Sequence, residues 1–434
     1  GNPGNTDRLN TVAQLEYARD IQYPRTLELL TSLSEMYKDM LKKDPSRKAE
    51  LEDRIFSFDN SIKAYSGILA GLRDPMLMQR KKDFEKSFRE SVEADPKLKE
   101  QYGNLWDKIA DSRKQLSEIS NKNFALNMNR LSTPQYFFIA DELIDIAENL
   151  KLPETDRNEL YVGDELDNTL ASLFPEDFDT EMNNTLLEEK INALNKYLGP
   201  NDPLVKKFTN GLQGKEAVQY VLSKSKVTNL NDVKSLLKQG PDEVLKGDDP
   251  FIYFMMNSKV RAEEYSKKVN ELVELESSYS QQLGVALFNV YGTSIPPDAT
   301  FTLRLADGVV EGYPYNGTYA QPFTTFYGMY DRYIGQGKEF PWSLPERWST
   351  PPAGLDLSTP FNFVSTNDII GGNSGSPVIN RKAEIVGLAF DGNIQSLPGS
   401  FIFRTEENRT VSVHSSGMYE AIDKVYKLKR ISAE

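Results

Sequence analysis

The spacing of apolar residues changes near residues 280–295, and this change constrains the fold more than any other feature of the chain. From about Arg25 to about Tyr279, apolar residues recur mostly at every third or fourth position, as they do from Leu27 to Met40. That period is typical of helices that bury one face. Later in the chain, short alternating stretches are separated by Gly and Asp turns, which indicates short strands. The sequence therefore predicts a helical region followed by a β region.

The β region is expected to contain several short strands and a closing helix. A hairpin is predicted from residues 300–305 and 309–313, joined by the turn Ala306-Asp307-Gly308. An amphipathic helix is predicted from about Ser416 to Arg430. Short strands of this kind are typical of a small β-barrel. Further strands are predicted at residues 361–364, 377–379, 385–390, 400–403 and 410–414.

The helical region is expected to break into shorter helices at turn and capping signals. These signals are Asp202-Pro203, the run Asn229 to Asp232, and Gly240-Pro241-Asp242. We interpret the region as an insert whose helices pack on each other. An independent ligand-binding bundle is the alternative.

Composition excludes several classes of function. The net charge of −13, with no basic stripe to offset it, argues against nucleic acid as a partner. The chain has no cysteine and one histidine, His414, which excludes thiol chemistry and multi-histidine metal sites. No apolar run approaches the roughly 18 residues of a membrane span. We therefore expect neither a metal nor another cofactor, and no membrane span.

A glycine-rich run from Thr366 to Ile379 carries the strongest chemical signal. It reads Thr-Asn-Asp-Ile-Ile-Gly-Gly-Asn-Ser-Gly-Ser-Pro-Val-Ile. A serine nucleophile needs a tight, exposed turn near which backbone N–H groups converge to hold an oxyanion. The glycines permit such a turn. We interpret Ser374 as the nucleophile and the N–H groups of Gly372 and Ser374 as the oxyanion hole. The alternative is a Gly/Asn/Ser hairpin turn without chemistry.

This loop resembles the Gly-Asp-Ser-Gly-Gly-Pro signature of chymotrypsin-like peptidases, with Asn373 and Ser376 as departures. With the run Gly387 to Asn393, it resembles more closely the bacterial dipeptidyl-peptidase 7 and 11 family. The likeness extends to Pro297–Arg304, to the opening turn Gly1–Arg8 and to the helical region, so it covers most of the chain. The resemblance implies a serine dipeptidyl aminopeptidase that is secreted or periplasmic and acts on peptides with a free N-terminus.

The resemblance also assigns two residues to substrate binding. It implies that Asp391 helps to hold the α-ammonium group of the peptide, a role that suits a carboxylate. It places Gly392 on the wall of the P1 pocket, where the branch that prefers acidic P1 residues carries an arginine. Glycine there implies an open pocket for hydrophobic P1 side chains. The alternative for Asp391 is a turn aspartate before glycine.

The fold implied by pattern and resemblance together is α+β, with an all-helical insert domain followed by a chymotrypsin-like antiparallel β-barrel with a C-terminal helix. Residues 1–24 are predicted to be a remnant of a first β-barrel. Residues 25–279 form the predicted helical cap, and residues 280–434 form the predicted second barrel with the nucleophile. The resemblance also implies a homodimer formed through the cap.

The chain departs from the family in lacking an evident catalytic base. The family places its histidine and aspartate in the first barrel, upstream of the segment that Gly1–Arg8 resembles. His414 lies before the terminal helix, where a structural role is expected rather than that of a base. The opening has neither a methionine nor a signal segment, so we interpret the chain as a fragment of a larger protein, inactive by itself. A processed mature N-terminus is the alternative.

Other functions stay open at this point. Asp368 lies six positions before Ser374, where a trypsin-like enzyme holds the carboxylate that selects Lys or Arg at P1. A chymotrypsin-like endopeptidase is the alternative enzyme. A non-catalytic peptide-binding protein, in which the base is truly absent, is the alternative outside the enzymes.

Overall fold

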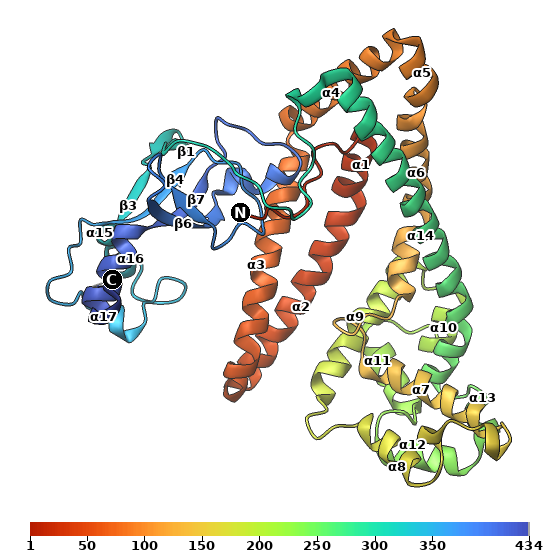
Figure 1. Ribbon diagram of the computed structural model, residues 1–434. Coiled ribbons are helices and arrows are strands. Elements are labelled where there is room, and N and C mark those ends of the chain that lie inside the picture. The colour runs from red at the N-terminus through yellow and green to blue at the C-terminus, as the bar shows by residue number, and fades with distance from the viewer. Residues whose placement is uncertain (433–434) are drawn as a thin grey trace. The chain divides into compact units, whose positions relative to one another are not determined.

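The computed structural model of the protein describes residues 1–432 (Figure 1). The chain divides by its contacts into two compact units, and neither is a single stretch of sequence. The first unit contains residues 1–27, 60–104 and 282–434, and the second contains residues 28–59 and 105–281. The three domains expected from the sequence divide the chain by position along the sequence, whereas these units divide it by contacts in space. Those domains therefore stay a prediction.

The second unit is helical, as the apolar spacing predicts. Three long helices run from one unit into the other: α2 (Tyr23–Lys43), α3 (Lys48–Arg73) and α14 (Pro250–Tyr291). The helices that belong to the second unit alone are α6 (Leu105–Leu126), α7 (Gln135–Leu150), α8 (Gly163–Ser172), α9 (Thr180–Tyr197), α10 (Pro203–Thr209), α11 (Gly214–Lys224), α12 (Leu230–Lys238) and α13 (Pro241–Leu245).

Capping residues explain where several of these helices begin. The carboxylate of Asp202 accepts hydrogen bonds from the N–H groups of Leu204 and Val205, and proline follows it at the first position of α10. The side chain of Asn229 caps α12 in the same manner. Such side chains satisfy backbone donors that the first turn of a helix leaves unpaired. The breaks predicted at Asp202-Pro203, Asn229 and Gly240-Pro241 are confirmed as helix starts.

Four phenylalanines lie at the centre of the second unit. Phe137 of α7, Phe208 of α10, and Phe251 and Phe254 of α14 are fully buried. Their ring centroids are 5.0 to 5.7 Å apart in tilted and edge-to-face arrangements. Each such pair contributes about 0.5–1.5 kcal/mol beyond the burial of its area. The cluster therefore joins α7 and α10 to the start of α14.

The β region of the first unit is an open sheet. Five antiparallel strands follow the order β3-β4-β7-β6-β5, and a separate pair joins β1 to β2. Helices followed by antiparallel sheet confirm the predicted α+β class. The expected barrel is not closed within the described residues, because the edge strands β3 and β5 do not pair with each other. The strands are β1 (Tyr313–Tyr315), β2 (Thr318–Ala320), β3 (Phe323–Thr325), β4 (Pro360–Ser365), β5 (Pro377–Ile379), β6 (Ile385–Gly392) and β7 (Thr410–His414).

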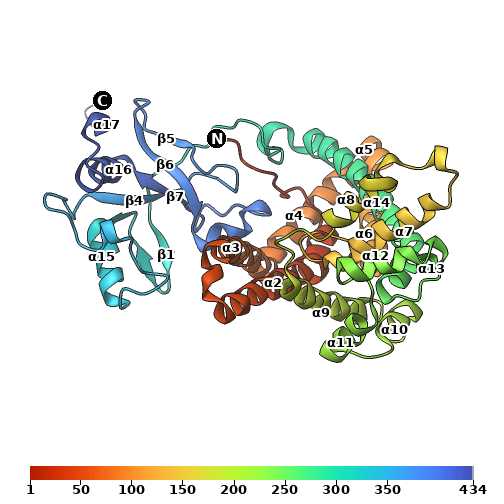
Figure 2. The ribbon, with the colours of Figure 1, turned by 90° about the horizontal axis from the view of Figure 1, so that it is seen from below.

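Figure 2 shows β4, β7, β6 and β5 side by side, with α16 (Ser415–Glu420) next to them. The four strands predicted at residues 361–364, 377–379, 385–390 and 410–414 are confirmed as β4 to β7. The helix predicted near the end of the chain is interrupted. It consists of α16, a π-helical turn from Ala421 to Val425, and α17 (Lys429–Ser432).

Two strand predictions are wrong. Residues 300–305 form no strand, and the side chains of Phe301, Leu303 and Leu305 are exposed. The predicted return strand runs instead beside the end of β4, through the bridge of Val310 with Ser365. Of residues 400–403, Ser400 ends a 3₁₀ segment, η7 (Ile394–Ser400), Phe401 lies in a turn, and residues 402–403 form no strand.

The core of the first unit explains why residues 400–403 are not a strand. Phe401 is 1% exposed and lies in a cluster with Leu15 of α1, Leu69 and Leu72 of α3, and Leu77 of α4. Its ring therefore lies among helices and is unavailable to a sheet. The helices of this unit beside α2, α3 and α14 are α1 (Val12–Tyr17), η1 (Ala18–Gln22), α4 (Pro75–Ala94), α5 (Pro96–Tyr102), α15 (Phe326–Gly335), α16 and α17.

None of the helices within residues 1–432 combines the length and apolar character needed to cross a membrane.

Lys190 of α9 is a buried cation in the second unit. Its Nζ donates a hydrogen bond of 2.8 Å to the carbonyl of Asn127, just beyond the end of α6. Burial lowers the pKa of Lys190 to about 7, because desolvation disfavours its charged form. A nearby carboxylate would raise the pKa of Lys190 again, but burial is the one cause that acts on it among the described residues.

We expect this lysine to give the protein a specific pH dependence of stability. Between pH 7 and 10.5 the unfolded chain binds more protons at this position than the folded protein does. The free energy of unfolding therefore rises with pH there, by at most about 1.4 kcal/mol per pH unit. Lys190→Met removes this contribution. Urea unfolding at pH 7.5 and 9.5 should show the unsubstituted protein gaining stability relative to the variant, and a constant difference would contradict the assignment.

Candidate active site

The glycine-rich run forms a tight loop between β4 and β5. Gly372 and Gly375 have φ angles of +96° and +83°, which a side chain with a β-carbon rarely adopts. Ser374 between them is exposed. Its Oγ lies 3.3 Å from the carbonyl oxygen of Phe390, to which it donates a hydrogen bond. The loop therefore presents a serine hydroxyl to solvent on a turn that its glycines make accessible.

Two backbone donors of this loop are unused. Neither the N–H of Gly372 nor that of Ser374 donates a hydrogen bond within the described residues. Asn373 between them is buried, and both its backbone N–H and its side-chain amide donate to the carbonyl of Ile370. An oxyanion hole needs unpaired N–H groups of this kind, directed at a common point beside the serine hydroxyl. The N–H groups of Gly372 and Ser374, which the sequence analysis assigned to the oxyanion hole, are thus available to bind a ligand.

Strand β6 lies next to the loop. Gly375 donates its N–H to the carbonyl of Ala389 at 2.7 Å, and Ala389 donates to the carbonyl of Ser376 at 2.9 Å. The pairing of β6 with β7 shifts register between Ala389 and Asp391, so Phe390 lies at a bulge. Bulges bend a strand and redirect the groups that follow. Here the residue at the bulge, Phe390, supplies the carbonyl that contacts Ser374, and Asp391 follows it directly.

Asp391 and Gly392 are the last two residues of β6. The Asp391 side chain is exposed, and its carboxylate accepts a hydrogen bond of 2.8 Å from the N–H of Gly392. The other carboxylate oxygen has no partner within residues 1–432. Asp391 thus follows the residue whose carbonyl contacts Ser374, and one of its carboxylate oxygens is available to bind a cation.

Gly392 is closely packed against the segment η7. A β-carbon placed on it would lie 2.2 Å from Oγ of Ser396, which donates its hydroxyl to the carbonyl of Asn393 at 2.6 Å. A side chain at this position would therefore force the Ser396 hydroxyl to move away from the carbonyl of Asn393. Sequence reasoning missed Ser396, because a serine in a polar turn gives no distinguishing signal.

His414 has a structural role, as expected. It ends β7, and its Nδ1 accepts a hydrogen bond of 3.1 Å from the N–H of Ser416, which caps α16. Its ring packs against Phe323 and Phe363, with centroids 6.0 and 5.6 Å away. This partial burial lowers the pKa of His414. In the described part of the chain, Ser374 therefore has no histidine partner.

Asp368 is paired with an arginine from the other end of the chain. The guanidinium of Arg8 donates two hydrogen bonds to its carboxylate, at 2.5 and 2.8 Å. Arg8 belongs to residues 1–8, which we call the N-terminal strap. An aspartate held in this fork cannot serve as a free carboxylate for a basic P1 side chain, so the geometry argues against trypsin-like specificity. The contacts of Arg8 were not foreseen, because they join residues 360 positions apart.

Other polar sites in the described chain do not contribute side chains to the site around Ser374 and Asp391. Residues 1–432 contain no group of three or more His, Asp or Glu side chains placed to hold a metal ion.

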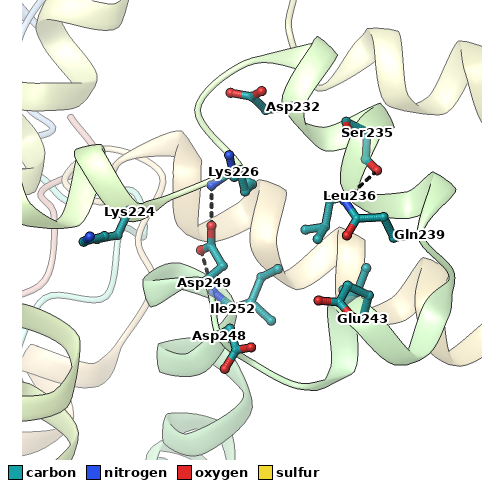
Figure 3. Close-up of a pocket in the computed structure, with 11 residues that line it drawn as sticks. Lys224, Lys226, Asp232, Ser235, Leu236, Gln239, Glu243, Asp248, Asp249 and Ile252 are labelled. Carbon is teal, nitrogen blue, oxygen red and sulfur yellow. Dashed lines mark hydrogen bonds between the residues drawn. The ribbon is translucent and has the colours of Figure 1, made fainter.

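The second unit contains a cavity of about 250 Å³, lined by α11, α12, α13 and the start of α14 (Figure 3). Its buried carboxylate, Asp249, caps α14 and accepts hydrogen bonds from Ser225, Lys226, Phe251 and Ile252. Burial raises the pKa of Asp249. That carboxylate has a structural task.

Comparison with known proteins identifies the family. The family model described as Peptidase S46 matches residues 1–434. The chain belongs to the peptidase S46 family. This confirms the resemblance inferred from the nucleophile loop.

Several characterised relatives of this S46 chain are dipeptidyl peptidases. It is 25% identical over 453 residues to "Dipeptidyl-peptidase 7" of Porphyromonas endodontalis, covering all of this chain and 53% of that protein. It is 27% identical over 411 residues to an "Asp/Glu-specific dipeptidyl-peptidase" of Flavobacterium psychrophilum, covering 90% of this chain and 56% of that protein. The chain thus spans little more than half the length of these relatives.

A solved structure supports the fold of this S46 chain. The crystal structure of Porphyromonas endodontalis DPP11 matches 100% of the chain and 63% of its own length, with a TM-score of 0.75 and 18% identity. At this identity the likeness shows that the two share a fold.

Helix α3 packs closely against η7, the segment that carries Ser396. A β-carbon on Gly71 would lie 2.2 Å from Cγ of Pro398, and one on Gly67 would lie 2.0 Å from a methyl group of Leu397. The two glycines are four residues apart and so share one face of the helix. They allow η7 to approach the α3 backbone directly.

We expect Gly71→Ala to destabilise the protein by about 1–3 kcal/mol, because the rigid proline ring must move. Gly284→Ala is the matched control on α14, where a β-carbon would meet nothing within 4 Å. There alanine should stabilise the helix by about 0.5–1 kcal/mol. Thermal unfolding of both variants measures the two effects. Equal shifts in the same direction would show that the contact with Pro398 does not constrain α3.

Proposed function

We propose that this chain carries the nucleophile and one wall of the substrate site of a serine dipeptidyl aminopeptidase, which releases dipeptides from the free N-terminus of peptides. The observation that supports this best is the exposed hydroxyl of Ser374 with the unused N–H groups of Gly372 and Ser374 in the same turn, beside strand β6, which carries Asp391. Membership of the S46 family and the names of the relatives agree with it.

In the proposed reaction, Oγ of Ser374 attacks the carbonyl carbon of the second residue of the peptide. The serine proton passes to a general base, and the carbonyl oxygen becomes an oxyanion held by the N–H groups of Gly372 and Ser374. Each such donor contributes about 3–4 kcal/mol to the transition state. The base returns the proton to the leaving amine, and water then hydrolyses the ester to free the dipeptide and restore Ser374.

Asp391 is the proposed contact for the peptide α-ammonium group. Its exposed carboxylate has one oxygen without a partner in the described chain, on the strand whose bulge contacts Ser374. A charged contact at a fixed position along the strand would set how many residues reach Ser374. This accounts for the release of dipeptides and for the requirement for a free N-terminus.

The proposed P1 preference is hydrophobic. Gly392 carries no charge, and Ser396 beside it adds only a hydroxyl that is already bonded. Three arginines are bonded to residues 393–399: Arg8, Arg404 and Arg409. Each also has other partners, and Arg8 holds Asp368. Arg404 pairs with Glu407, and Arg409 donates to four backbone carbonyls. Relatives with preference for Asp and Glu show that the family also accommodates acidic P1 residues.

The general base is proposed to be a histidine, oriented by an aspartate, that lies outside these 434 residues. His414 is the chain's one histidine and is engaged with the N–H of Ser416. The relatives extend well beyond the stretch that they share with this chain. The 434 residues by themselves are accordingly proposed to be inactive. A periplasmic or secreted location and a homodimer are proposed on family resemblance alone.

The nucleophile is tested by labelling with a fluorophosphonate probe, which reacts with activated serines. We expect the full-length protein to be labelled and Ser374→Ala to abolish labelling. Ser376→Ala is the matched control in the same loop and should keep it. The 434-residue chain alone should label far more slowly, since it lacks the base. Rapid labelling of that chain would contradict an external base, and no labelling of the full-length protein would favour a non-catalytic peptide-binding protein.

The role of Asp391 is tested with a pair of peptides, one with a free and one with an acetylated N-terminus. Loss of a charged hydrogen bond costs about 1.5–3 kcal/mol, so Asp391→Asn should lower kcat/KM for the free peptide roughly ten- to hundredfold. The acetylated peptide should be a poor substrate for both proteins. Asp307→Asn, on an exposed segment that belongs to no helix or strand, is the control. Equal cleavage of the two peptides by the unsubstituted protein would instead indicate an endopeptidase.

A further inference from the structure

The N-terminal strap, residues 1–8, contacts the nucleophile loop and the segments around it. Gly4 donates its N–H to the carbonyl of Gly371 at 2.7 Å. A β-carbon on Gly372 would lie 2.6 Å from the carbonyl oxygen of Asn2. Gly1 exchanges two hydrogen bonds with the backbone of Arg304. The backbone of the strap thus lies directly against the residue whose N–H is assigned to the oxyanion hole.

Arg8 at the end of the strap joins two separate segments. Its guanidinium holds the carboxylate of Asp368, four residues before Gly372 in the glycine-rich run. The same guanidinium donates two further hydrogen bonds, of 2.9 and 2.8 Å, to the carbonyl of Gly399. Gly399 lies in η7, whose Ser396 packs against Gly392. The Arg8 side chain therefore connects two segments. One precedes the residues assigned to the oxyanion hole, and the other packs against the expected wall of the P1 pocket.

Arg8 is itself held on both sides. Its N–H donates to Asp298 at 2.8 Å, and its carbonyl accepts a hydrogen bond of 2.6 Å from Nζ of Lys81 on α4. The Lys81 side chain is buried against the strap. A fixed backbone and a planar, five-donor guanidinium leave the Asp368 and Gly399 contacts little freedom to rearrange.

We propose that Arg8 is a positioning residue: it sets the nucleophile loop relative to η7 and thereby aims the oxyanion donors. The inference rests on the proposed function and adds a residue to it. Arg8 acts through Asp368 and Gly399 and touches neither substrate nor Ser374. Lysine in its place would offer a point charge without the two-pronged geometry.

The test measures the rate of fluorophosphonate labelling of Ser374 together with kcat and KM in the full-length protein. The variants are Arg8→Gln, Arg8→Lys, Asp368→Asn and the double variant Arg8→Gln with Asp368→Asn. Arg304→Gln is the matched control. Its side chain also donates two hydrogen bonds next to the strap, but to the carbonyls of Pro297 and Asp298.

We expect Arg8→Gln to lower the labelling rate and kcat at least tenfold with little change in KM. Arg8→Lys should restore only part of this loss. The double variant should be no slower than the slower single variant, since both changes break one contact. Arg304→Gln should label at close to the normal rate. Arg8→Lys and Asp368→Asn keep the test decisive if Arg8→Gln fails to fold.

Labelling of the Arg8 and Asp368 variants at the normal rate would overturn this inference and leave the proposed function standing. An equal loss in Arg304→Gln would do the same, because the effect would then be general destabilisation. If the unsubstituted full-length protein is not labelled at Ser374, the proposed function fails and the inference fails with it.

Discussion

Two hydrogen bonds between the nucleophile loop and β6 determine the geometry of the candidate site. Gly375 donates to Ala389, and Ala389 donates to Ser376. These bonds fix the loop at the point where β6 bulges, so the hydroxyl of Ser374 meets the carbonyl of Phe390. Without this register Asp391 would face another part of the sheet. The left-handed glycines on either side of Ser374 are what allow the chain to make both bonds within so short a turn.

The predictions that held are those that depend on local pattern. Strands β4 to β7 are short stretches that contain β-branched or aromatic residues and lie between turns, and that composition is visible within a few residues of sequence. The tight turn around Ser374 was predictable because its glycines accept backbone angles that other residues rarely adopt. The helix starts at Asp202 and Asn229 were equally local, since an N-cap bonds residues two or three positions away.

The failures come from contacts between distant parts of the chain. Residues 300–305 alternate as a strand does, but alternation cannot say whether a neighbouring strand is present to pair with. Phe401 looked like part of a strand and instead fills a cluster of helices from the first 80 residues. The strap carries only turn signals, yet Arg8 holds Asp368. No local rule connects positions so far apart, so the tertiary contacts of the strap were not predictable.

The separation of Arg8 from Asp368 also bears on the order in which the molecule is completed. The strap is the first part of these 434 residues to be synthesised, whereas its partners at Asp368 and Gly399 are among the last. Closing a loop of 360 residues carries an entropic cost that must be met before the contact forms. The loop around Ser374 therefore acquires its final support only after the intervening helices exist. We expect a polypeptide still under synthesis to hold Ser374 in an unsupported loop until residues up to Gly399 have been made and folded.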